Sequence, residues 1–259
     1  AIDAVSEGNK GKVAARRRGR GAGFSPGWAP LACGLLALAL HLNTLSTNEF
    51  IWDDRAAILM NEDVRPSTPL SSLLVHDFWG QSISLPDSHK SYRPLAVLSF
   101  RLNFLLHGLE PWGYHAANLA LHAGVTGLFV LLVGTLSDGR SDGRALAWLS
   151  GLLFAVHPIH TEPVASLVGR ADLLCAFFAL AALLLFLSAA QHSSTGRLAA
   201  AFLLGFAASF SKEVGVTVFG LFVAHELIEA LLLGCSVAGP SPWTALRAMV
   251  EYVAQHPSV

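Results

Sequence analysis

The chain has 259 residues, of which 53% are hydrophobic and only 14% are charged, with a formal net charge of −1 and a mean hydropathy of +0.51. This composition is too apolar for an ordinary soluble domain and indicates a protein that crosses a membrane several times. The small net charge hides an asymmetry, because six cations precede the first apolar segment: Lys10, Lys12, Arg16, Arg17, Arg18 and Arg20.

Residues 1–27 are basic and rich in glycine, and we expect them to be disordered. A basic run of this kind can be a tail that binds nucleic acid. Next to an apolar segment it is better explained as a signal that keeps this end in the cytosol, so no nucleic-acid partner is predicted. The apolar segment lacks a small-x-small cleavage site before Asn48, which favours an uncleaved anchor over a signal peptide.

Six apolar segments follow, and each is predicted to be a membrane helix. They cover about residues 30–45, 115–136, 145–156, 172–190, 198–210 and 214–233. Several are shorter than the roughly 20 residues that a helix needs to cross the hydrocarbon core. Their polar ends would then have to be buried against protein or a water-filled cavity. The predicted fold class is all-α, a polytopic membrane helix bundle of about six transmembrane helices spanning residues 28–233.

The connections between these segments alternate between the two sides of the membrane. With a cytosolic N-terminus, three connections are predicted to be luminal: the long first loop at 46–114, residues 157–171, and residues 211–213. The SDGRSDGR connection at 137–144 and the connection at 191–197 then face the cytosol. The clusters of charged and histidine residues after each span therefore share one membrane face.

The three cysteines are predicted to be buried small hydrophobes. Cys33, Cys175 and Cys235 all lie in apolar segments, which argues against a disulfide framework or a metal site.

Asp53 and Asp54 follow the first apolar segment directly. Side chains of adjacent residues diverge on a helix or strand, so the two carboxylates need not share one site. One carboxylate can act as a general base while the other binds a metal or holds a substrate hydroxyl. The alternative is an acidic collar at the membrane interface or a helix cap.

His157, His160 and Glu162 lie in a segment with two prolines, which argues against a regular helix. Their H-x-x-H-x-E pattern is one reading of a zinc site, although it lacks the spacing of H-E-x-x-H. A second reading is recognition of an anionic group, with Arg170 as a forked donor to phosphate. The third is a pair of ordinary interfacial histidines.

Lys212 and Glu213 separate the last two apolar segments, either as an exposed turn or as a phosphate-binding lysine oriented by a carboxylate. The first loop adds a cationic and aromatic stretch that is either a solvated loop or a substrate loop. Its candidate residues are His89, Lys90, Tyr92 and Arg93.

Together these residues suit transfer of a sugar from a membrane-embedded phosphate donor. A carboxylate would deprotonate the acceptor hydroxyl, and cations would stabilise the leaving phosphate. An enzyme of this kind requires one of the two aspartates, Arg170 and Lys212 to face a common luminal cavity, whereas a scaffold does not. A transporter would need ionisable residues in the middle of its spans, but here they lie at the ends.

Seven motifs, in order, resemble the transmembrane and tetratricopeptide-repeat (TMTC) proteins. They are 53–58 (DDRAAI), 61–64 (NEDV), 76–80 (HDFWG), 88–95 (SHKSYRPL), 154–162 (FAVHPIHTE), 168–172 (VGRAD) and 212–217 (KEVGVT). The similarity covers about residues 46–233. It lies in the N-terminal part of the family only, because the family's 34-residue helical repeats are absent from this sequence. Residues 234–259 match neither a span nor a repeat, apart from an amphipathic stretch at 243–253.

The resemblance implies a GT-C-like O-mannosyltransferase of the endoplasmic-reticulum membrane. Such an enzyme takes mannose from dolichyl-phosphate mannose and transfers it to Ser or Thr of secretory-pathway proteins, notably cadherin domains. It implies Asp53 and Asp54 as the catalytic pair, with Asp54 the favoured base. It also implies a donor and phosphate site formed by His160, Glu162, Arg170, Lys212 and Glu213. The metal requirement stays open, and the alternatives are a truncated inactive form or a non-enzymatic membrane scaffold.

Overall fold

The computed structural model describes residues 27–238, with the side chains described as far as residue 231. Every regular element in this range is helical, as the sequence predicts. The chain forms two compact units, Ala1–Gly215 and Val216–Val259. The predicted disordered terminus at 1–27 and the tail at 234–259, including the stretch at 243–253, lie almost wholly outside the described residues.

Five long helices form the body of the first unit: α2 (Ala29–Leu40), α4 (Pro111–Leu136), α5 (Gly143–Val156), α7 (Arg170–His192) and α8 (Thr195–Ser211). Their limits follow local signals. Proline occupies the first turn of α2 and α4, where its missing N–H costs nothing. Ser193 ends α7 in the left-handed conformation, and the Ser194 side chain caps α8 by accepting a hydrogen bond from the Arg197 N–H.

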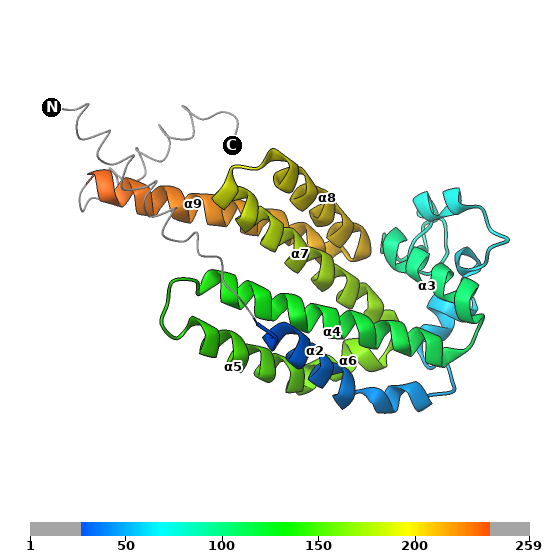
Figure 1. Cartoon of the computed structure of the whole chain (residues 1–259). Coiled ribbons are helices and arrows are strands. Elements are labelled where there is room, and N and C mark those ends of the chain that lie inside the picture. Colours follow the sequence, from blue (N-terminus) through cyan, green and yellow to red (C-terminus); the bar gives the residue numbers. More distant parts are fainter. Residues whose placement is uncertain (1–26, 239–259) are drawn as a thin grey trace. The chain divides into compact units, whose positions relative to one another are not determined.

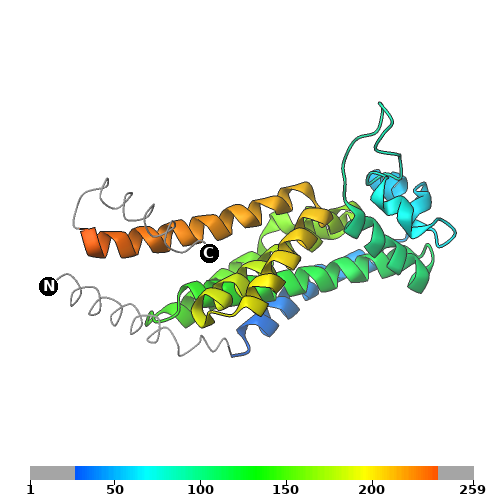
Figure 2. The same ribbon diagram turned by 90° about the horizontal axis from the view of Figure 1, so that it is seen from above.

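Helix α4 lies at the centre of this unit. Both α2 and α5 pack on α4 and on each other, α7 packs on α4, and α8 packs on α7 (Figures 1 and 2). Gly151 of α5 permits the close approach, because a Cβ there would lie 2.3 Å from a methyl carbon of Val130. Cys33 and Cys175 are free and buried, as predicted.

Among the described residues, three helical stretches are long and apolar enough to cross a membrane: Pro111–Leu136, Leu167–His192 and Glu213–Leu231. Four shorter apolar helices are α2, α5, α8 and α3 (Pro94–His107). A helix of 12 residues such as α2 is only about 18 Å long, less than the thickness of the hydrocarbon core. The structure thus supports a membrane protein with three candidate spans. The second unit contributes α9 (Thr217–Ala238), to which most of the third span belongs.

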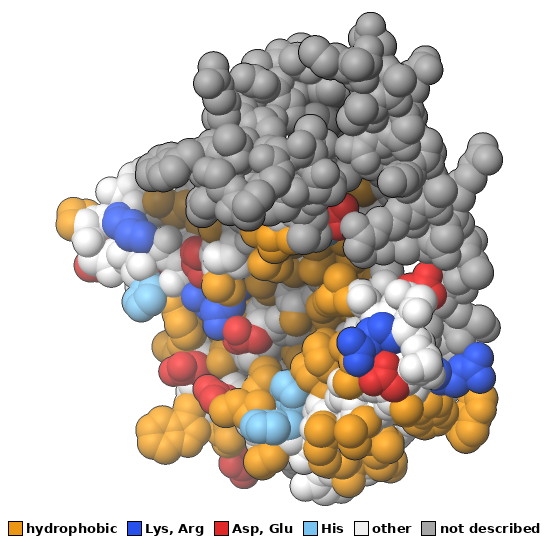
Figure 3. Space-filling model, turned by 90° about the vertical axis from the view of Figure 1, so that its left-hand side faces the viewer, with side chains coloured by type: hydrophobic (Ala, Val, Ile, Leu, Met, Phe, Trp, Pro, Cys, Tyr) orange, Lys and Arg blue, Asp and Glu red, His pale blue; other side chains and the backbone are white. Residues whose placement is uncertain are grey.

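The connections of the first unit divide between its two ends (Figures 1 and 2). The first loop with α3, the 157–169 connection and the end of α8 gather at one end, which we call the loop end. The connections at 137–142 and 193–194 lie at the other. Figure 3 views that other end, where described charged side chains of both signs form small groups among hydrophobic ones.

The short helical turns are concentrated at the loop end. They are η1 (Leu42–Ser46), η2 (Arg55–Leu59), η3 (Glu62–Val64), η4 (Leu70–Leu74), η5 (Pro158–His160), α6 (Thr161–Ala165), η6 (Leu167–Gly169) and η7 (Glu213–Val216). The 157–163 segment is thus broken into short turns, with Pro163 in the first turn of α6, where proline is tolerated.

The HDFWG motif holds the first loop together. Gly80 has φ +82°, and a Cβ there would lie 2.4 Å from Asn61 Oδ1. The Asn61 side chain in turn donates to the Phe78 carbonyl oxygen at 3.1 Å. Asp77 accepts hydrogen bonds from the Ser88 hydroxyl and from backbone N–H groups. Burial alone would raise the pKa of Asp77, but these hydrogen bonds outweigh it and lower the pKa.

Candidate functional site

The two adjacent aspartates have different environments. Asp53 is exposed, whereas Asp54 is buried. Asp54 Oδ1 accepts a hydrogen bond from the backbone N–H of Val168 at 3.0 Å, across 114 residues of sequence. This bond fastens the first loop to the 157–169 connection. The predicted divergence of the two side chains is therefore observed, and it places only Asp53 at the surface.

Burial raises the pKa of the Asp54 carboxyl group. Hydrogen bonds from the backbone of Val168, Leu167 and Ile51 act in the opposite direction, and the negative charge of Asp53 adds to the increase. A carboxyl group with a raised pKa accepts a proton more readily near neutral pH. The Asp54 side chain, however, has little exposed surface.

Arg170 is buried at the start of α7, and protein acceptors surround its guanidinium. Its Nε donates to Asn118 Oδ1 at 2.8 Å, and its Nη1 donates to Asn103 Oδ1 at 2.5 Å. Its Nη2 donates to the Tyr114 carbonyl oxygen at 2.6 Å. The guanidinium also lies 4.8 Å from the ring centroid of Phe100. Arg170 thus ties α7 to α3 and α4, and its N–H groups point toward protein.

The connection before Arg170 is held equally tightly. Val168, whose N–H binds Asp54, lies two residues before the anchored arginine. Gly169 lies between them, and a Cβ on it would come within 2.5 Å of the Pro163 backbone. Asp54 and Arg170 therefore act on the same turn, η6, one from the first loop and one from the bundle.

Lys212 and Glu213 each form an ion pair with another segment. Lys212 Nζ lies 2.6 Å from Asp172 Oδ1 on α7, and both side chains are partly exposed. Arg93 Nε donates to both carboxylate oxygens of Glu213 at 3.1 Å, across 120 residues. The end of α8 is thereby joined to α7 on one side and to the first loop on the other.

The four candidate residues of the substrate loop divide into two pairs. His89 hydrogen-bonds the Ser91 hydroxyl, and the Lys90 ammonium donates to carbonyl groups of the same loop. Tyr92 instead packs edge-on against Phe210 of α8, with ring centroids 6.1 Å apart. His89 and Lys90 therefore shape the loop, whereas Tyr92 and Arg93 dock it on the bundle.

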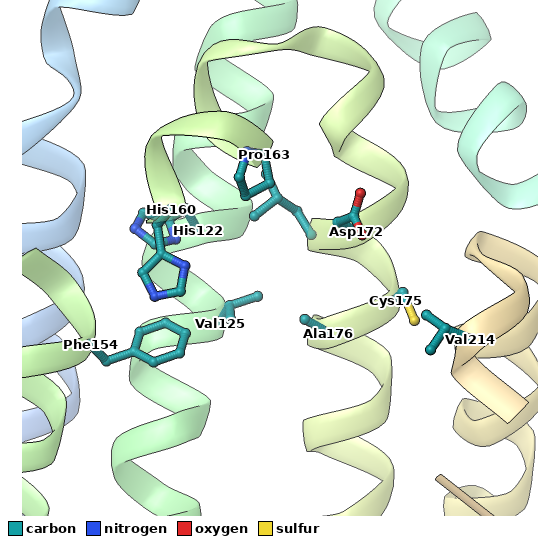
Figure 4. Close-up of a pocket in the computed structure, with 10 residues that line it drawn as sticks. His122, Val125, Phe154, His160, Pro163, Asp172, Cys175, Ala176 and Val214 are labelled. Atoms are coloured by element: carbon teal, nitrogen blue, oxygen red, sulfur yellow. The ribbon is translucent and has the colours of Figure 1, made fainter. Parts of the chain in front are cut away.

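A cavity of about 300 Å³ opens between α4, α5 and α7 (Figure 4). His122, His160 and Phe154 lie on one side of it, and Asp172 and Cys175 of α7 lie on the other. The rings of His122 and His160 are 5.2 Å apart, and Phe154 lies 4.2 Å from His160. His122 Nε2 is buried and has no hydrogen-bond partner within the described residues.

The pKa of His160 is lowered by its surroundings. Burial lowers its pKa, and the neighbouring His157 and His41 lower it further. Glu162, two residues later, is exposed and does not line the cavity.

The lining of this cavity includes none of Asp53, Asp54, Arg170 and Lys212. This cavity therefore does not bring these four residues together. Asp172 provides the connection that does exist, because it lines the cavity and also binds Lys212.

The zinc interpretation of the H-x-x-H-x-E pattern finds no support in the geometry. Between residues 27 and 231, no three His, Cys, Asp or Glu side chains come close enough together to hold a metal ion. His157 is exposed, and its Nδ1 accepts a hydrogen bond from the Ile159 N–H.

Sequence reasoning missed three polar residues of this end: Asn103, Asn118 and His122. Asn118 and His122 are four residues apart on α4, and both are buried on one face of an apolar helix. Polar side chains inside a predicted span generally face protein or a cavity. That signal was available for Asn118 and His122, but it does not reveal that Asn118 accepts from Arg170 of α7 or that His122 packs beside His160 of η5.

No family model and no solved structure matches the chain. The chain is 42% identical over 220 residues to "Protein O-mannosyl-transferase TMTC4" from Homo sapiens. The alignment covers 78% of the chain and 30% of that protein. It is 46% identical over 213 residues to TMTC2 from Mus musculus, and the alignment covers 77% of the chain and 24% of that protein. It is 40% identical over 238 residues to TMTC1 from Mus musculus, and the alignment covers 87% of the chain and 25% of that protein. The chain thus spans less than a third of the length of these relatives.

Proposed function

Because the chain belongs to the TMTC family and corresponds to the N-terminal part of its members, we propose that it forms the N-terminal membrane part of a protein O-mannosyltransferase. The relatives are named for this activity. The proposed donor is dolichyl-phosphate mannose, and the proposed acceptors are Ser and Thr hydroxyls of secretory-pathway proteins such as cadherins. The proposed fold is GT-C-like, in the endoplasmic-reticulum membrane, with a cytosolic N-terminus.

The observation that carries this proposal is the joining of three segments at the loop end. The bond from Val168 to Asp54 links the first loop to the 157–169 connection. The ion pair between Arg93 and Glu213 links that loop to the end of α8. The residues that we propose for the acceptor and the donor therefore lie at the same end of one bundle, which supports the proposal.

For the acceptor side, we assign proton acceptance to Asp53 and positioning to Asp54. A general base must come within hydrogen-bond distance of the hydroxyl it deprotonates, and Asp53 is the exposed member of the pair. The hydroxyl proton passes to the carboxylate while the hydroxyl oxygen attacks C1 of mannose. The bond between C1 and the phosphate oxygen breaks, dolichyl phosphate leaves, and the configuration at C1 inverts.

For the donor side, Lys212 is the favoured cation. It is partly exposed, and a movement away from Asp172 would bring its ammonium to the leaving phosphate. His160, Glu162 and Glu213 remain candidate donor-site residues. Arg170 is assigned a positioning role, because its donors are already used within the protein.

The alternative is a non-enzymatic membrane scaffold. One observation favours it: the lining of the described cavity includes neither aspartate nor Arg170. In the scaffold, the ion pairs at the loop end would only stabilise the fold.

A mannosyl-transfer assay separates the two. The purified chain is compared with a longer form continued by the C-terminal segments of human TMTC4, using dolichyl-phosphate mannose and a cadherin-domain acceptor. In the longer form, Asp53→Asn should reduce transfer by about 10²- to 10⁴-fold without changing the melting temperature. Asp87→Asn, at an exposed position of the same loop, is the control and should keep full activity. Full activity in the Asp53→Asn, Asp54→Asn double variant would refute the assignment.

A further inference from the structure

Helix α3 has two apolar faces, only one of which is buried. Ala96, Val97 and Phe100 are buried in the core of the loop end. On another face, Leu102, Leu105 and Leu106 are 54%, 59% and 77% exposed. An exposed run of leucines on a helix with a well-packed opposite side is unusual for a surface in water.

These leucines form a continuous stripe. At 100° per residue, Leu102, Leu105 and Leu106 fall within an arc of about 100°, and the partly exposed Leu95 lies on the same arc. Leu98 also lies on this arc but packs against the buried core of the loop end. Leu109 and Trp112, which follow directly, are also exposed. We call this surface, Leu95 to Trp112 on the exposed side, the leucine stripe.

The corner between α3 and α4 fixes the stripe to the start of a candidate span. Asn103 Nδ2 donates to the Gly113 carbonyl oxygen, and the Tyr114 hydroxyl donates to the Gly108 carbonyl oxygen, both at 3.0 Å. The rings of His107 and Trp112 are 4.8 Å apart. Gly113 permits this packing, because a Cβ there would lie 2.4 Å from the His107 ring.

Helix α3 is shorter than the thickness of the hydrocarbon core. Its 14 residues give a length of about 21 Å, and it lies at the loop end, beside the start of α4 (Figures 1 and 2). Arg101 on its buried side donates to the carbonyl oxygens of Asp63 and Pro66, which holds the helix to the first loop.

We propose that the leucine stripe is a membrane-interface surface, and that it rests in the boundary between headgroups and acyl chains where α4 enters the bilayer. The rigid corner sets α3 at the depth of the first turn of α4, and an amphipathic helix at that depth buries its apolar side in lipid. Trp112 lies where aromatic residues accumulate in membrane proteins. The first loop would thus be held at a defined height above the membrane, irrespective of the reaction it supports.

Site-directed spin labelling of the full 259-residue chain in phosphatidylcholine vesicles tests the proposal. Cys33, Cys175 and Cys235 are replaced by alanine, and a nitroxide is attached at Leu106→Cys. The matched control is Asp87→Cys, which is exposed in the same loop and lies outside the stripe. Relaxation by oxygen, which partitions into lipid, is compared with relaxation by a water-soluble nickel chelate.

The expected result is a several-fold higher ratio of oxygen to nickel accessibility at position 106 than at position 87. Equal ratios would place the stripe in water and overturn the proposal. Low accessibility to both reagents at position 106 would mean that protein covers the stripe, either a second copy or another part of the chain, and would also overturn it. Quenching of a fluorophore at position 106 by brominated lipid gives a second reading, and its absence would contradict lipid contact.

Discussion

Arg170 is a buried cation stabilised mainly by neutral acceptors. Its contacts are two asparagine side-chain oxygens, backbone carbonyls and aromatic rings of α3 and α4. Removing a charge from water costs several kcal/mol unless such groups replace the lost hydration. Arg170 can therefore be kept only if α3, α4 and α7 meet as they do here.

This arrangement predicts that Arg170→Lys is destabilising although it preserves the charge. A lysine ammonium is a point donor and cannot reach Asn103, Asn118 and the Tyr114 carbonyl together. The free energy of unfolding should fall by about 3 kcal/mol, as for other broken buried charge networks. Thermal unfolding in detergent micelles measures the change. Arg197→Lys, at an exposed arginine that bonds the Ser188 hydroxyl, should change stability by less than about 0.5 kcal/mol. Similar effects at the two positions would refute the positioning role.

For individual residues, the sequence pointed to the charged side chains but not to their hydrogen-bond partners. Asp54, Arg170 and Lys212 were singled out because charge beside a bilayer is rare without a reason. Each partner lies tens of residues or more away, as with Val168 for Asp54, and no local pattern specifies such a pairing. The sequence also does not predict which of the two aspartates is exposed, because this depends on how the first loop folds against η6.

The helices were predictable from the sequence wherever helix-breaking residues delimit an apolar segment. The predicted segments at 115–136, 145–156 and 172–190 correspond to α4, α5 and α7 within a few residues. Helix α3 was missed, because the 46–114 connection was interpreted as a long loop. Its signals were present: Pro94 at the first position, Gly108 after the end, and the helical spacing of the leucines. The surrounding prolines and polar residues outweighed them.

The link between the first loop and α8 yields a prediction for these elements. In a double-mutant cycle, Arg93→Gln and Glu213→Gln should show a coupling free energy of about 0.5–1 kcal/mol, because the Arg93 side chain is largely buried in the pair. The measurement is the free energy of unfolding of the single and double variants.

The control cycle uses Arg140 and Asp142, an ion pair of 2.8 Å at the other end, in which both side chains are about 60% exposed. Its coupling should be near zero, because solvent screens exposed pairs. A coupling at Arg93 and Glu213 no larger than in this control would mean that the pair does not hold the loop to the bundle.

For the whole molecule, alternation of helices along the chain places the charged clusters together. This consequence was predictable from the sequence, because it needs only the order of the apolar segments and a fixed N-terminal side. The number of spans was not predictable in the same way. In the part of the chain that the structure describes, three helices are long enough to cross the membrane. The shorter helices could cross only if neighbouring protein buried their polar ends, and helix length alone does not reveal such neighbours.

We propose that the first loop lies on the luminal side of the membrane, opposite the 137–142 connection. Glycosylation mapping tests it most directly, because the chain has no natural Asn-x-Ser/Thr site. Pro86→Asn creates such a site in the first loop with Ser88, and Gly139→Asn creates one in the 137–142 connection with Ser141. Expressed in microsomes, the first variant should gain one endoglycosidase-sensitive glycan and the second none. A glycan on the Gly139→Asn variant, with none on the Pro86→Asn variant, would contradict the account.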